Sequence, residues 1–387
     1  MIPRMDVIGA GDGTVGANQS GVADHNARLI LTVLRHGGPL PGAELARRTG
    51  LSPQGISTIL RRLEADGLVM RGEPLRGQVG KPRVPLSIAP EGGLAFGLKI
   101  GRRSLELVLT DLAGRVRAQR EEFHDYPLPE ATIDFVARST GDLIADAKGQ
   151  GLDPDRICGL GVAMPFEIWE WADHLGAPEA DFAAWREFDL AAALGRAGPW
   201  PVTLRNDVTS AARAELALGP AREERDWAYF FVGAFVGGGV ILDGRVRDGR
   251  QGNAGALGSL SICLPDRTGQ LIDAASLYLL NGPAQPAGNM EEPADRSVLD
   301  PWFDRAAPAL AQAVLDACSV IDFEAAVIDG AMTAGMRSEL VRRVSSVIGT
   351  LDRRGLVLPA IHEGTFGAPA RAVGAALAPL EQRYFLS

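Results

Sequence analysis

Two amphipathic segments separated by only two residues, Gly50 and Leu51, constrain the fold of this chain more than any other feature. The first segment spans residues 41–49. The second opens with Ser52-Pro53, an N-cap residue followed by proline at the first helical position. Apolar residues then recur at helical spacing, at Ile56, Ile59, Leu60 and Leu63. The sequence therefore predicts two short helices joined by a tight turn, in which Gly50 takes a positive φ.

The segment AELARRTGLSPQGISTILRRLEADGLV resembles the helix-turn-helix of bacterial repressors. With the apolar face turned inward, the opposite face of its second helix presents polar side chains that suit DNA. Glutamine can pair with adenine and arginine with guanine or phosphate, while serine and threonine take either role. The candidate DNA-binding residues on this helix are Ser52, Gln54, Ser57, Thr58, Arg61 and Arg62. The alternative is a three-helix oligomerisation module whose polar face is only solvated.

The surrounding sequence predicts a winged helix over residues 23–90. A further helix is expected before the pair, capped by Asp24. After the pair, LVMRGEP and VPLSIAP indicate two short strands around a glycine-rich tip. The tip adds three cations to the candidate DNA-binding residues, Arg76, Lys81 and Arg83, in the place of a wing that contacts the minor groove or backbone. An exposed hairpin without function is the alternative.

Charge divides the chain in the way a DNA-binding regulator requires. Residues 1–90 hold 11 Arg and Lys against 7 Asp and Glu, although the whole chain has a net charge of −9. A basic module on an acidic body places positive charge only where phosphate must be met. Residues 1–22, rich in Gly, Ser and Asn, are expected to form a flexible arm.

Composition places the protein among globular cytoplasmic proteins. The 387 residues, 46% of them hydrophobic, suffice for two or three domains with more than one core. The sequence contains no apolar run long enough for a membrane span and no signal peptide, so we expect a cytoplasmic location without membrane partners. The three cysteines, Cys158, Cys263 and Cys318, are too scattered for a disulfide framework or a thiolate zinc site, and all are expected to be buried.

The remainder of the chain alternates short apolar runs with helical stretches, which predicts α/β layers. Two similar blocks suggest two lobes with a cleft between them, the first over residues 91–205 and the second over residues 206–387. The C-terminal helix is expected to return to the first lobe. The apolar runs are ICGLGVAMP, PVTLRND, WAYFFVGAFVGGGVILDG and AAVIDGAM, preceded by strands that start near Leu94.

Several motifs, in this order, resemble the ROK family of repressors and sugar kinases. They are GVAMP, RNDVTSAARAE, GAFVGGGVILDGRVRDGRQGNAGALGS and GAPARAVGAAL, behind the winged helix. The resemblance implies a two-lobed actin/hexokinase-like, ribonuclease H-like body. It also implies that Asn206-Asp207 matches the pair that binds sugar hydroxyls and supplies the general base in family kinases. The same two residues would equally suit a helix N-cap.

The sequence departs from the kinase pattern of the family where phosphate, metal and sugar would be held. Lys99 stands in place of an aspartate, and Arg102 and Arg103 replace small residues of the ATP-binding turn. Ala256 and Ser259 replace a sugar-binding glutamate and a histidine, and the cysteine-rich zinc segment is missing. We therefore expect no catalytic residue, no metal and no cofactor. The two arginines are expected to be exposed or salt-bridged, with anion binding as the alternative.

The expected ligand of the cleft is a sugar or a sugar-derived effector. Its candidate binding residues are Asn206, Asp207, Asn253, Glu167 and Trp169, the tryptophan as a surface for stacking on a pyranose. Packing between lobes or subunits is the alternative for the tryptophan. The combined hypothesis is a transcriptional regulator, most simply a repressor, that binds double-stranded operator DNA as a homodimer or homotetramer. The alternatives are an active sugar kinase with a DNA-binding appendage and a ligand-independent DNA-binding protein.

Overall fold

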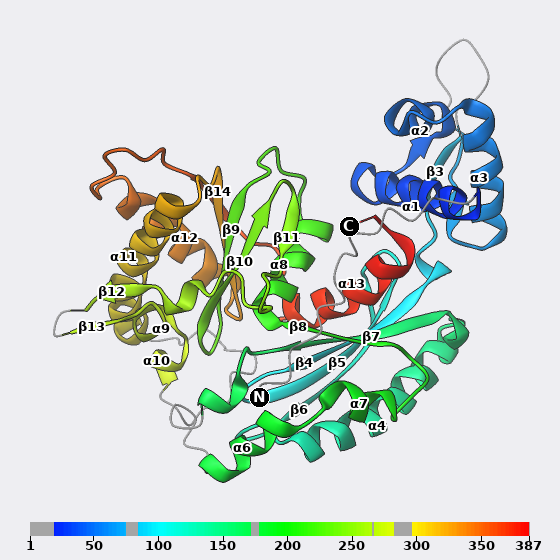
Figure 1. The fold of residues 1–387 in the computed structure, drawn as a ribbon. Helices are drawn as coiled ribbons and strands as arrows, with labels where there is room; N and C mark the ends of the chain where they lie inside the picture. The colour runs from blue at the N-terminus through cyan, green and yellow to red at the C-terminus, as the bar shows by residue number, and fades with distance from the viewer. Residues whose placement is uncertain (1–18, 75–83, 172–177, 265–266, 282–295, 387) are drawn as a thin grey trace.

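The first part of the chain folds into three helices and a small antiparallel sheet (Figure 1). The computed structural model describes residues 19–74, 84–171, 178–264, 267–281 and 296–386. The helices are α1 (Gln19–Gly37), α2 (Gly42–Thr49) and α3 (Pro53–Ala65). The strands are β1 (Leu40–Pro41), β2 (Val69–Arg71) and β3 (Pro85–Ile88), with β3 in the centre. This is a helix-turn-helix followed by a winged hairpin.

Local signals explain the turn between α2 and α3. Gly50 caps α2 with a φ of 71°. The Ser52 hydroxyl accepts a hydrogen bond from the Gly55 amide at 3.1 Å, and Pro53 occupies the first helical position. The predicted cap at Asp24 is wrong, because α1 begins at Gln19. The Asp24 carboxylate lies within the helix instead, 3.2 Å from the Arg62 guanidinium of α3.

Two five-stranded sheets with the same topology form the body of the protein. In each sheet the first three strands are antiparallel neighbours and the last two run parallel to the central strand. The first sheet is β6 (Val116–Phe123), β5 (Ser104–Asp111), β4 (Leu94–Ile100), β7 (Ile157–Met164) and β8 (Val202–Asn206). The second is β11 (Arg245–Arg247), β10 (Val236–Leu242), β9 (Trp227–Val232), β14 (Ala325–Gly330) and β15 (Ala360–Glu363). The predicted α/β body with two similar lobes is confirmed.

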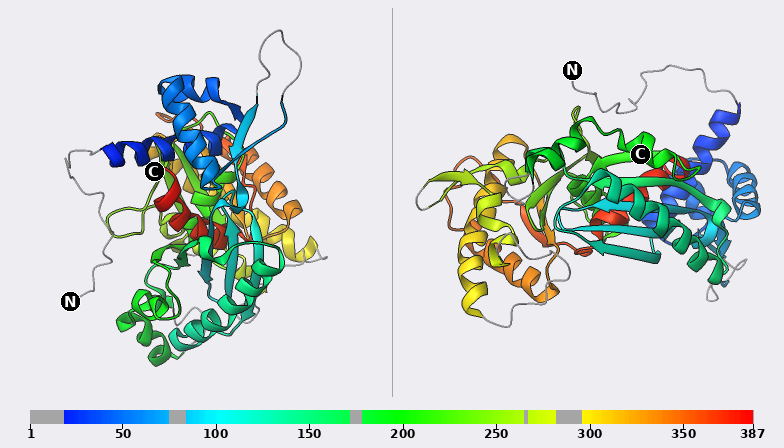
Figure 2. Two further views of the ribbon diagram at one scale, coloured as in Figure 1. Left: turned by 90° about the vertical axis from the view of Figure 1, so that its right-hand side faces the viewer. Right: turned by 90° about the horizontal axis from the view of Figure 1, so that it is seen from below.

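Helices cover both sheets, and two of them lie between the lobes (Figures 1 and 2). α8 (Asp207–Leu218) and α13 (Ala370–Tyr384) pack against each other; α13 covers the first sheet and α8 contacts the second. The outer helices are α4 (Pro129–Gly149), α6 (Glu179–Glu187), α7 (Leu190–Gly195), α11 (Arg296–Val320) and α12 (Ala334–Ile348). A hairpin of β12 (Ser261–Cys263) and β13 (Thr268–Gln270) and two short helices, α9 (Ile272–Ala275) and α10 (Tyr278–Asn281), complete the second lobe.

Small residues allow α13 to lie unusually close to its neighbours. A Cβ atom on Gly161 of β7 would lie 1.8 Å from the Ala375 carbonyl oxygen, and one on Gly97 of β4 would lie 2.1 Å from that of Ala372. On the other side, a Cβ on Gly374 would lie 1.7 Å from the Ser210 carbonyl of α8. The large side chains of β4 point to the opposite face of the sheet. Because small residues face α13 and large side chains face the other way, α13 packs in close backbone contact with the first sheet and with α8.

The winged helix shares its hydrophobic core with α13 and the first lobe. Leu31 and Leu34 of α1 belong to the same buried cluster as Leu377 and Leu380 of α13. Backbone contacts reinforce this junction, because Arg28 donates from Nε to the Phe385 carbonyl at 2.8 Å and the Thr32 hydroxyl accepts from the Leu386 amide at 2.9 Å. α13 therefore connects the winged helix with the body.

Two further expectations from the sequence concern the cysteines and membrane-spanning segments. Cys158 and Cys318 are buried, but Cys263 is exposed, so the prediction of three buried thiols is wrong for Cys263. It is the last residue of β12 in the short β12–β13 hairpin, next to the buried Ile262 and on the opposite, exposed face of the strand. Among the helices of the described ranges, none is long and apolar enough to cross a membrane.

Candidate functional site

The outer face of α3 presents the polar side chains selected from the sequence. Gln54, Ser57, Thr58 and Arg61 are all exposed, while Ile56, Leu60 and Leu63 are buried on the opposite face. The Arg61 side chain folds along its own helix and donates from Nε to the Ser57 carbonyl at 3.2 Å. Ser52 is exposed but its hydroxyl already caps the helix. The face is therefore accessible to a nucleic acid along its whole length.

Arg62 occupies the flank of α3 rather than its outermost face. Its guanidinium lies 3.2 Å from Asp24 of α1 and 3.7 Å from Asp66 at the end of α3. Both pairs are exposed, so each contributes little to stability and can be exchanged for a phosphate. The three cations of the wing tip, Arg76, Lys81 and Arg83, lie outside the described residues.

A cavity of about 430 Å³ opens between the two lobes, large enough for a small metabolite. Its wall comes from the turn after β4, the segment after β7, the start of α8, the β9–β10 pair, the loop after β11 and the first turn of α13. Four of the five predicted effector-binding residues line it, namely Asn206, Asp207, Asn253 and Glu167. The lining also includes Gly237, Gly238 and Ser259.

Asn206 and Asp207 combine a structural task with a place in this wall. The Asn206 Oδ1 atom accepts hydrogen bonds from the Val208 and Thr209 amides, both at 3.0 Å, and so caps α8. The buried Asp207 carboxylate accepts from the Val208 amide at 3.0 Å and lies 3.7 Å from the Arg371 guanidinium. The N-cap alternative is thus correct for Asn206, and the same cap holds the Asp207 side chain at the cavity.

Two arginines converge on Asp207 from different elements. Arg102, in the turn between β4 and β5, stacks on the Phe235 ring with its guanidinium carbon 4.1 Å from the ring centroid. Arg371, in the first turn of α13, stacks on Phe231 at 4.9 Å. Burial lowers the pKa of Arg102 to about 10, opposed by Asp207 and assisted by Arg371. Two cationic side chains, Arg102 and Arg371, therefore line the cavity together with Asp207.

Arg103 behaves differently from its neighbour. It is not among the residues that line the cavity, and its guanidinium donates to the Asp125 carbonyl. The sequence analysis considered Arg102 and Arg103 together as a possible anion-binding pair. The two arginines that line the cavity are instead Arg102 and Arg371. The sequence analysis missed Arg371, although the segment GAPARAVGAAL that contains it was recognised.

Glu167 and Trp169 lie on the same short segment but in different surroundings. Glu167 is exposed at the cavity and adopts a φ of 44°, a left-handed conformation that is rare outside glycine. Trp169 is half-buried against the hydrophobic core and is not among the cavity-lining residues. Its prediction as a stacking surface for a ligand is corrected, because its apolar ring packs into the lobe instead. Trp185 is buried as well, with its indole nitrogen donating to Pro127 at 2.9 Å.

Lys99 is buried and is not among the residues that line the cavity. Its ammonium group donates to the Ser104 hydroxyl at 2.9 Å and lies 3.6 Å from Glu106 and 3.9 Å from Glu121. Burial lowers the pKa of Lys99 to about 8. In the described part of the chain, no group of three or more His, Cys, Asp and Glu side chains is arranged to hold a metal ion.

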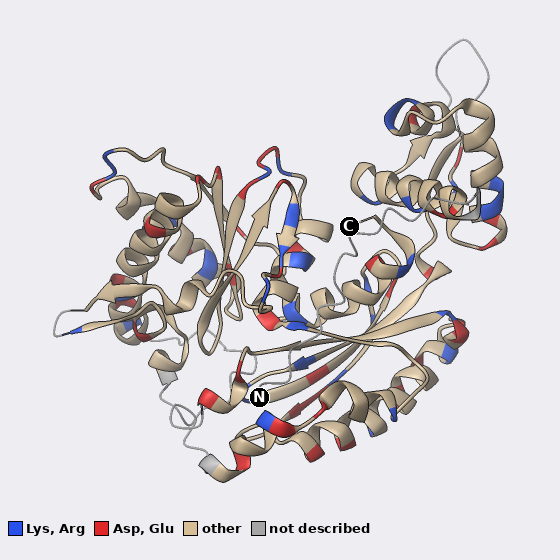
Figure 3. Ribbon diagram, in the orientation of Figure 1, with Lys and Arg blue, Asp and Glu red and all other residues tan. Residues whose placement is uncertain are grey.

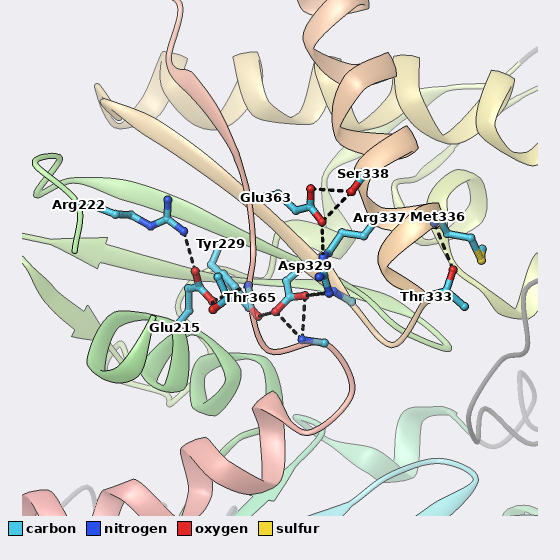
Figure 4. A network of polar contacts seen from close by, with 12 residues as sticks. Glu215, Arg222, Tyr229, Asp329, Thr333, Met336, Arg337, Ser338, Glu363 and Thr365 are labelled. Atoms are coloured by element: carbon cyan, nitrogen blue, oxygen red, sulfur yellow. Dashed lines mark hydrogen bonds and ion pairs between the residues drawn. The ribbon is translucent and has the colours of Figure 1, made fainter. Parts of the chain in front are cut away.

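A polar network fixes the loop from which α13, and with it Arg371, begins (Figure 4). The buried Asp329 carboxylate at the end of β14 accepts hydrogen bonds from the Gly367 amide at 3.0 and 3.1 Å and from the Tyr229 hydroxyl at 2.9 Å. Arg337 of α12 donates to the same carboxylate at 3.2 Å. Glu215 of α8 accepts from the Thr365 amide at 3.0 Å. The loop is thus tied to both lobe 2 and α8.

Comparison with known protein families gives matches to two separate parts of the chain. Residues 95–270 match the ROK family, and residues 20–77 match the MarR family. An uncharacterised protein, y4fQ, of Sinorhizobium fredii is 27% identical over 92% of this chain and 91% of its own length. The xylose repressor of Bacillus spizizenii is 24% identical over 64% of this chain. That alignment spans 62% of the repressor, somewhat less than two thirds of its length.

Solved structures share the architecture. The crystal structure of a ROK family transcriptional regulator, described as a homologue of the Escherichia coli MLC protein, superposes with a TM-score of 0.67 at 19% identity, covering 94% of this chain and 96% of that one. A ROK family glucokinase from Streptomyces griseus superposes with a TM-score of 0.56 at 20% identity, covering 73% of this chain and 98% of the glucokinase. At these identities the comparisons establish the fold. Residues 95–270 thus form a ROK family domain, which follows an N-terminal winged helix that matches the MarR family over residues 20–77.

Proposed function

We propose that this protein is a DNA-binding transcriptional repressor of carbohydrate metabolism whose binding responds to a small ligand in the cavity between the lobes. The observation that carries the proposal is the course of α13. Arg371 in its first turn lines the cavity, while Glu381 and Phe385 at its other end contact α1 of the winged helix. Its 15 residues span about 22 Å. A ligand that changes the relative position of the lobes would therefore also change, or fix, the position of α13, against which the winged helix packs.

A series of ion pairs connects α1 with the loop after β11. Arg35 of α1 lies 3.4 Å from Glu381 of α13, and Glu381 lies 2.6 Å from Arg213 of α8. Arg213 in turn lies 3.6 Å from Asp248, directly before the loop that carries Asn253. These groups are mostly buried, so each guanidinium depends on its partner. The series supports a coupling between the position of the cavity loop and that of α1.

The outer face of α3 is the proposed DNA-reading surface. Gln54, Ser57, Thr58 and Arg61 would meet base edges or phosphates in the major groove. A homodimer would place two such helices on successive half-sites of double-stranded DNA. One relative, 24% identical over 64% of this chain, is named as a xylose repressor, which supports a sugar or sugar-derived effector here.

We also propose that the cavity senses rather than phosphorylates its ligand. The turn after β4 that would approach ATP phosphates holds Arg102 and Arg103, and Asp207 is engaged by Arg371. A coupled assay of ATP consumption over a panel of sugars is expected to give no turnover above background. Sustained turnover that is lost in Asp207→Asn would instead establish the kinase alternative.

Fluorescence anisotropy with the DNA upstream of the protein's own gene tests the regulator proposal. Arg61→Ala is expected to weaken binding about tenfold or more and to reduce its salt dependence. Arg342→Ala, which removes an exposed arginine on α12, serves as the matched control and should bind as the wild type does. Equal binding by Arg61→Ala and wild type would contradict the placement of the DNA surface.

A second measurement on the same DNA tests whether ligand binding in the cavity affects DNA binding through α13. In Glu381→Gln, the direct connection between α1 and α8 is weakened while α3 is untouched. DNA binding without ligand is expected to persist, and the change in affinity that a bound ligand causes is expected to shrink. A full ligand response in this variant would show that the effect does not travel through α13.

A further inference from the structure

The turn that ends α3 contacts the first lobe as well as the winged helix. Within the turn, the Leu63 carbonyl of α3 accepts a hydrogen bond from the Leu68 amide at 2.8 Å. The Asp66 carbonyl accepts instead from the guanidinium of Arg156, a residue of the first lobe, at 3.1 Å. Carbonyl groups at the C-terminal end of a helix carry the negative end of its dipole, so a cation is favoured there. Arg156 thus caps α3 from outside the winged helix.

Arg156 joins three segments of the chain that are far apart in the sequence. The Nη1 atom that donates to Asp66 also donates to the Gly92 carbonyl at 3.0 Å, in the connection from β3 to β4. The Nε atom lies 3.9 Å from the Asp153 carboxylate of the same lobe. Arg156 itself directly precedes β7 and its side chain is half-buried. One guanidinium therefore connects the end of α3, the segment before β4 and the start of β7.

The two segments that Arg156 joins to its own lobe also contact each other. A Cβ atom on Gly92 would lie 2.5 Å from the Gly67 carbonyl oxygen, and one on Gly67 would lie 3.1 Å from Nη2 of Arg156. The Ala89 amide donates to the Leu68 carbonyl at 2.9 Å. The turn after α3 therefore packs against the connection to β4 without space for a side chain at Gly92.

The winged helix thus meets the body through two sets of residues. In the first set, α1 contacts the end of α13 through Arg28 and Thr32. In the second set, the end of α3 contacts Arg156 and the connection to β4. A domain held at one contact can still rotate about it, and a second contact on another helix restricts that rotation. The orientation of α3 relative to the first lobe therefore depends on Arg156.

We propose that Arg156 is a positioning residue for DNA binding, which orients α3 on the first lobe by binding the carbonyl group at its end. This inference rests on the proposed function, in which α3 reads the DNA. Without Arg156, α3 samples further orientations, and only a fraction of the molecules is ready to bind. The apparent affinity falls by that fraction, while the contacts in the final complex stay the same.

Fluorescence anisotropy of the full-length protein, with the DNA upstream of its own gene and at several salt concentrations, tests this role. Arg156→Gln is expected to bind about tenfold more weakly than the wild type, with the same salt dependence, because the complex keeps its phosphate contacts. Arg138→Gln is the matched control, since it removes an exposed arginine that pairs with Glu122 in the same lobe, and it should bind as the wild type does. Unchanged affinity in Arg156→Gln would refute the positioning role. A reduced salt dependence would also refute it, because Arg156 would then bind phosphate itself.

Hydrogen exchange of the free protein, followed by mass spectrometry, measures the same contact without DNA. The amides of the last turn of α3, of Gly67 and of Leu68 are expected to exchange faster in Arg156→Gln than in the wild type. The amides of β4 and β7 should exchange as before. Equal exchange at the end of α3 would overturn the inference. Faster exchange throughout the first lobe would overturn it as well, because Arg156 would then support the fold in general.

The two measurements distinguish a failure of this inference from a failure of the proposed function. If Arg61→Ala binds DNA as the wild type does, but exchange in Arg156→Gln rises only at the end of α3, the proposed DNA surface fails and the hold of Arg156 on α3 stands. If DNA binding requires Arg61 but Arg156→Gln binds normally, the DNA surface stands and the positioning role fails.

Discussion

The two lobes share one strand order, but a buried charge on an inner strand of each is paired in a different way. In the first lobe Lys99 of β4 is buried, and its partners Ser104, Glu106 and Glu121 belong to β5 and β6 of the same sheet. In the second lobe it is Asp329 of β14, whose partners come from β9, α12 and the loop before α13. Figure 3 shows charged residues on both lobes. A duplicated topology therefore does not imply a duplicated task.

The two buried charges differ in how many elements of the fold they bind. The hydrogen bond and ion pairs of Lys99 stay within one sheet, although the charge of Arg371 also acts on it, so its loss should affect mainly the stability of that sheet. Asp329 joins three elements, one of which leads directly to Arg371 at the cavity. We therefore expect a change at Asp329 to alter both stability and ligand binding, whereas a change at Lys99 should alter stability alone.

The largest effect is expected for Asp329→Ala. Its removal leaves the mostly buried Arg337 guanidinium and the Gly367 amide without this acceptor, and we expect the free energy of unfolding to fall by about 3–5 kcal/mol. Urea unfolding followed by tryptophan fluorescence measures it. Affinity for a ligand of the cavity should fall too, because the loop before Arg371 loosens. A loss below about 1 kcal/mol would contradict the tertiary role of Asp329.

Lys99→Met is expected to lower the free energy of unfolding by about 3 kcal/mol, because the buried Glu106 carboxyl loses its cation. Burial already raises the pKa of Glu106. The double variant Lys99→Met/Glu106→Leu removes both charges and should recover most of this loss. Ligand affinity should stay the same in both variants. If it falls, the first lobe reaches the cavity as the second does, and the contrast between the lobes disappears.

The first lobe also contains a histidine whose burial makes stability depend on pH. Burial, with Lys99 and Arg103 nearby, lowers the pKa of His124 to about 4. The folded state therefore favours the neutral imidazole. This contribution is complete above about pH 6.5 and is lost as the pH falls toward 4. Since His124 is partly exposed, we expect it to account for about 1–2 kcal/mol. Unfolding at several pH values in wild type and His124→Gln should show a shallower slope in the variant; equal slopes would contradict the assignment.

The smallest effect is expected for Thr333→Ala. The Thr333 hydroxyl caps α12 by accepting from the Met336 amide at 3.2 Å, close to the Asp329 network (Figure 4). Its loss should lower the free energy of unfolding by about 1 kcal/mol and leave ligand affinity unchanged. The variant is a control for Asp329→Ala, because it weakens the same region locally. Reduced ligand affinity in Thr333→Ala would mean that general weakening of the second lobe explains both results.

Local signals made much of the fold predictable from the sequence. The turn at Gly50 and the cap at Ser52-Pro53 act within a few residues, and the short apolar runs that form β7, β9 and β14 follow from residue type alone. The shared strand order of the two sheets was not predicted in detail, because β9 pairs with β14 about a hundred residues later. The start of α1 was misplaced because Asp24 forms a tertiary ion pair that sequence patterns do not encode.

The cavity residues, too, were predictable only where the signal in the sequence is local. Asn206, Asp207 and Glu167 lie near strand ends, where functional side chains gather, and the sequence placed them correctly at the cleft. Arg371 lies 164 residues beyond Asp207 and reaches it only because glycines let α13 pack closely. A long-range approach of this kind leaves no local signal. Trp169 was misassigned because an aromatic ring satisfies a core as readily as a ligand.

The exposed thiol of Cys263 has a practical consequence. Cys158 and Cys318 are buried, and burial raises the pKa of the Cys158 thiol to about 11 and also raises that of Cys318, so neither forms the reactive thiolate readily. A maleimide dye should therefore attach selectively to the β12–β13 hairpin without any engineered residue. Because β13 ends at Gln270, which lines the cavity, such a dye would report lobe movement in real time during ligand titration.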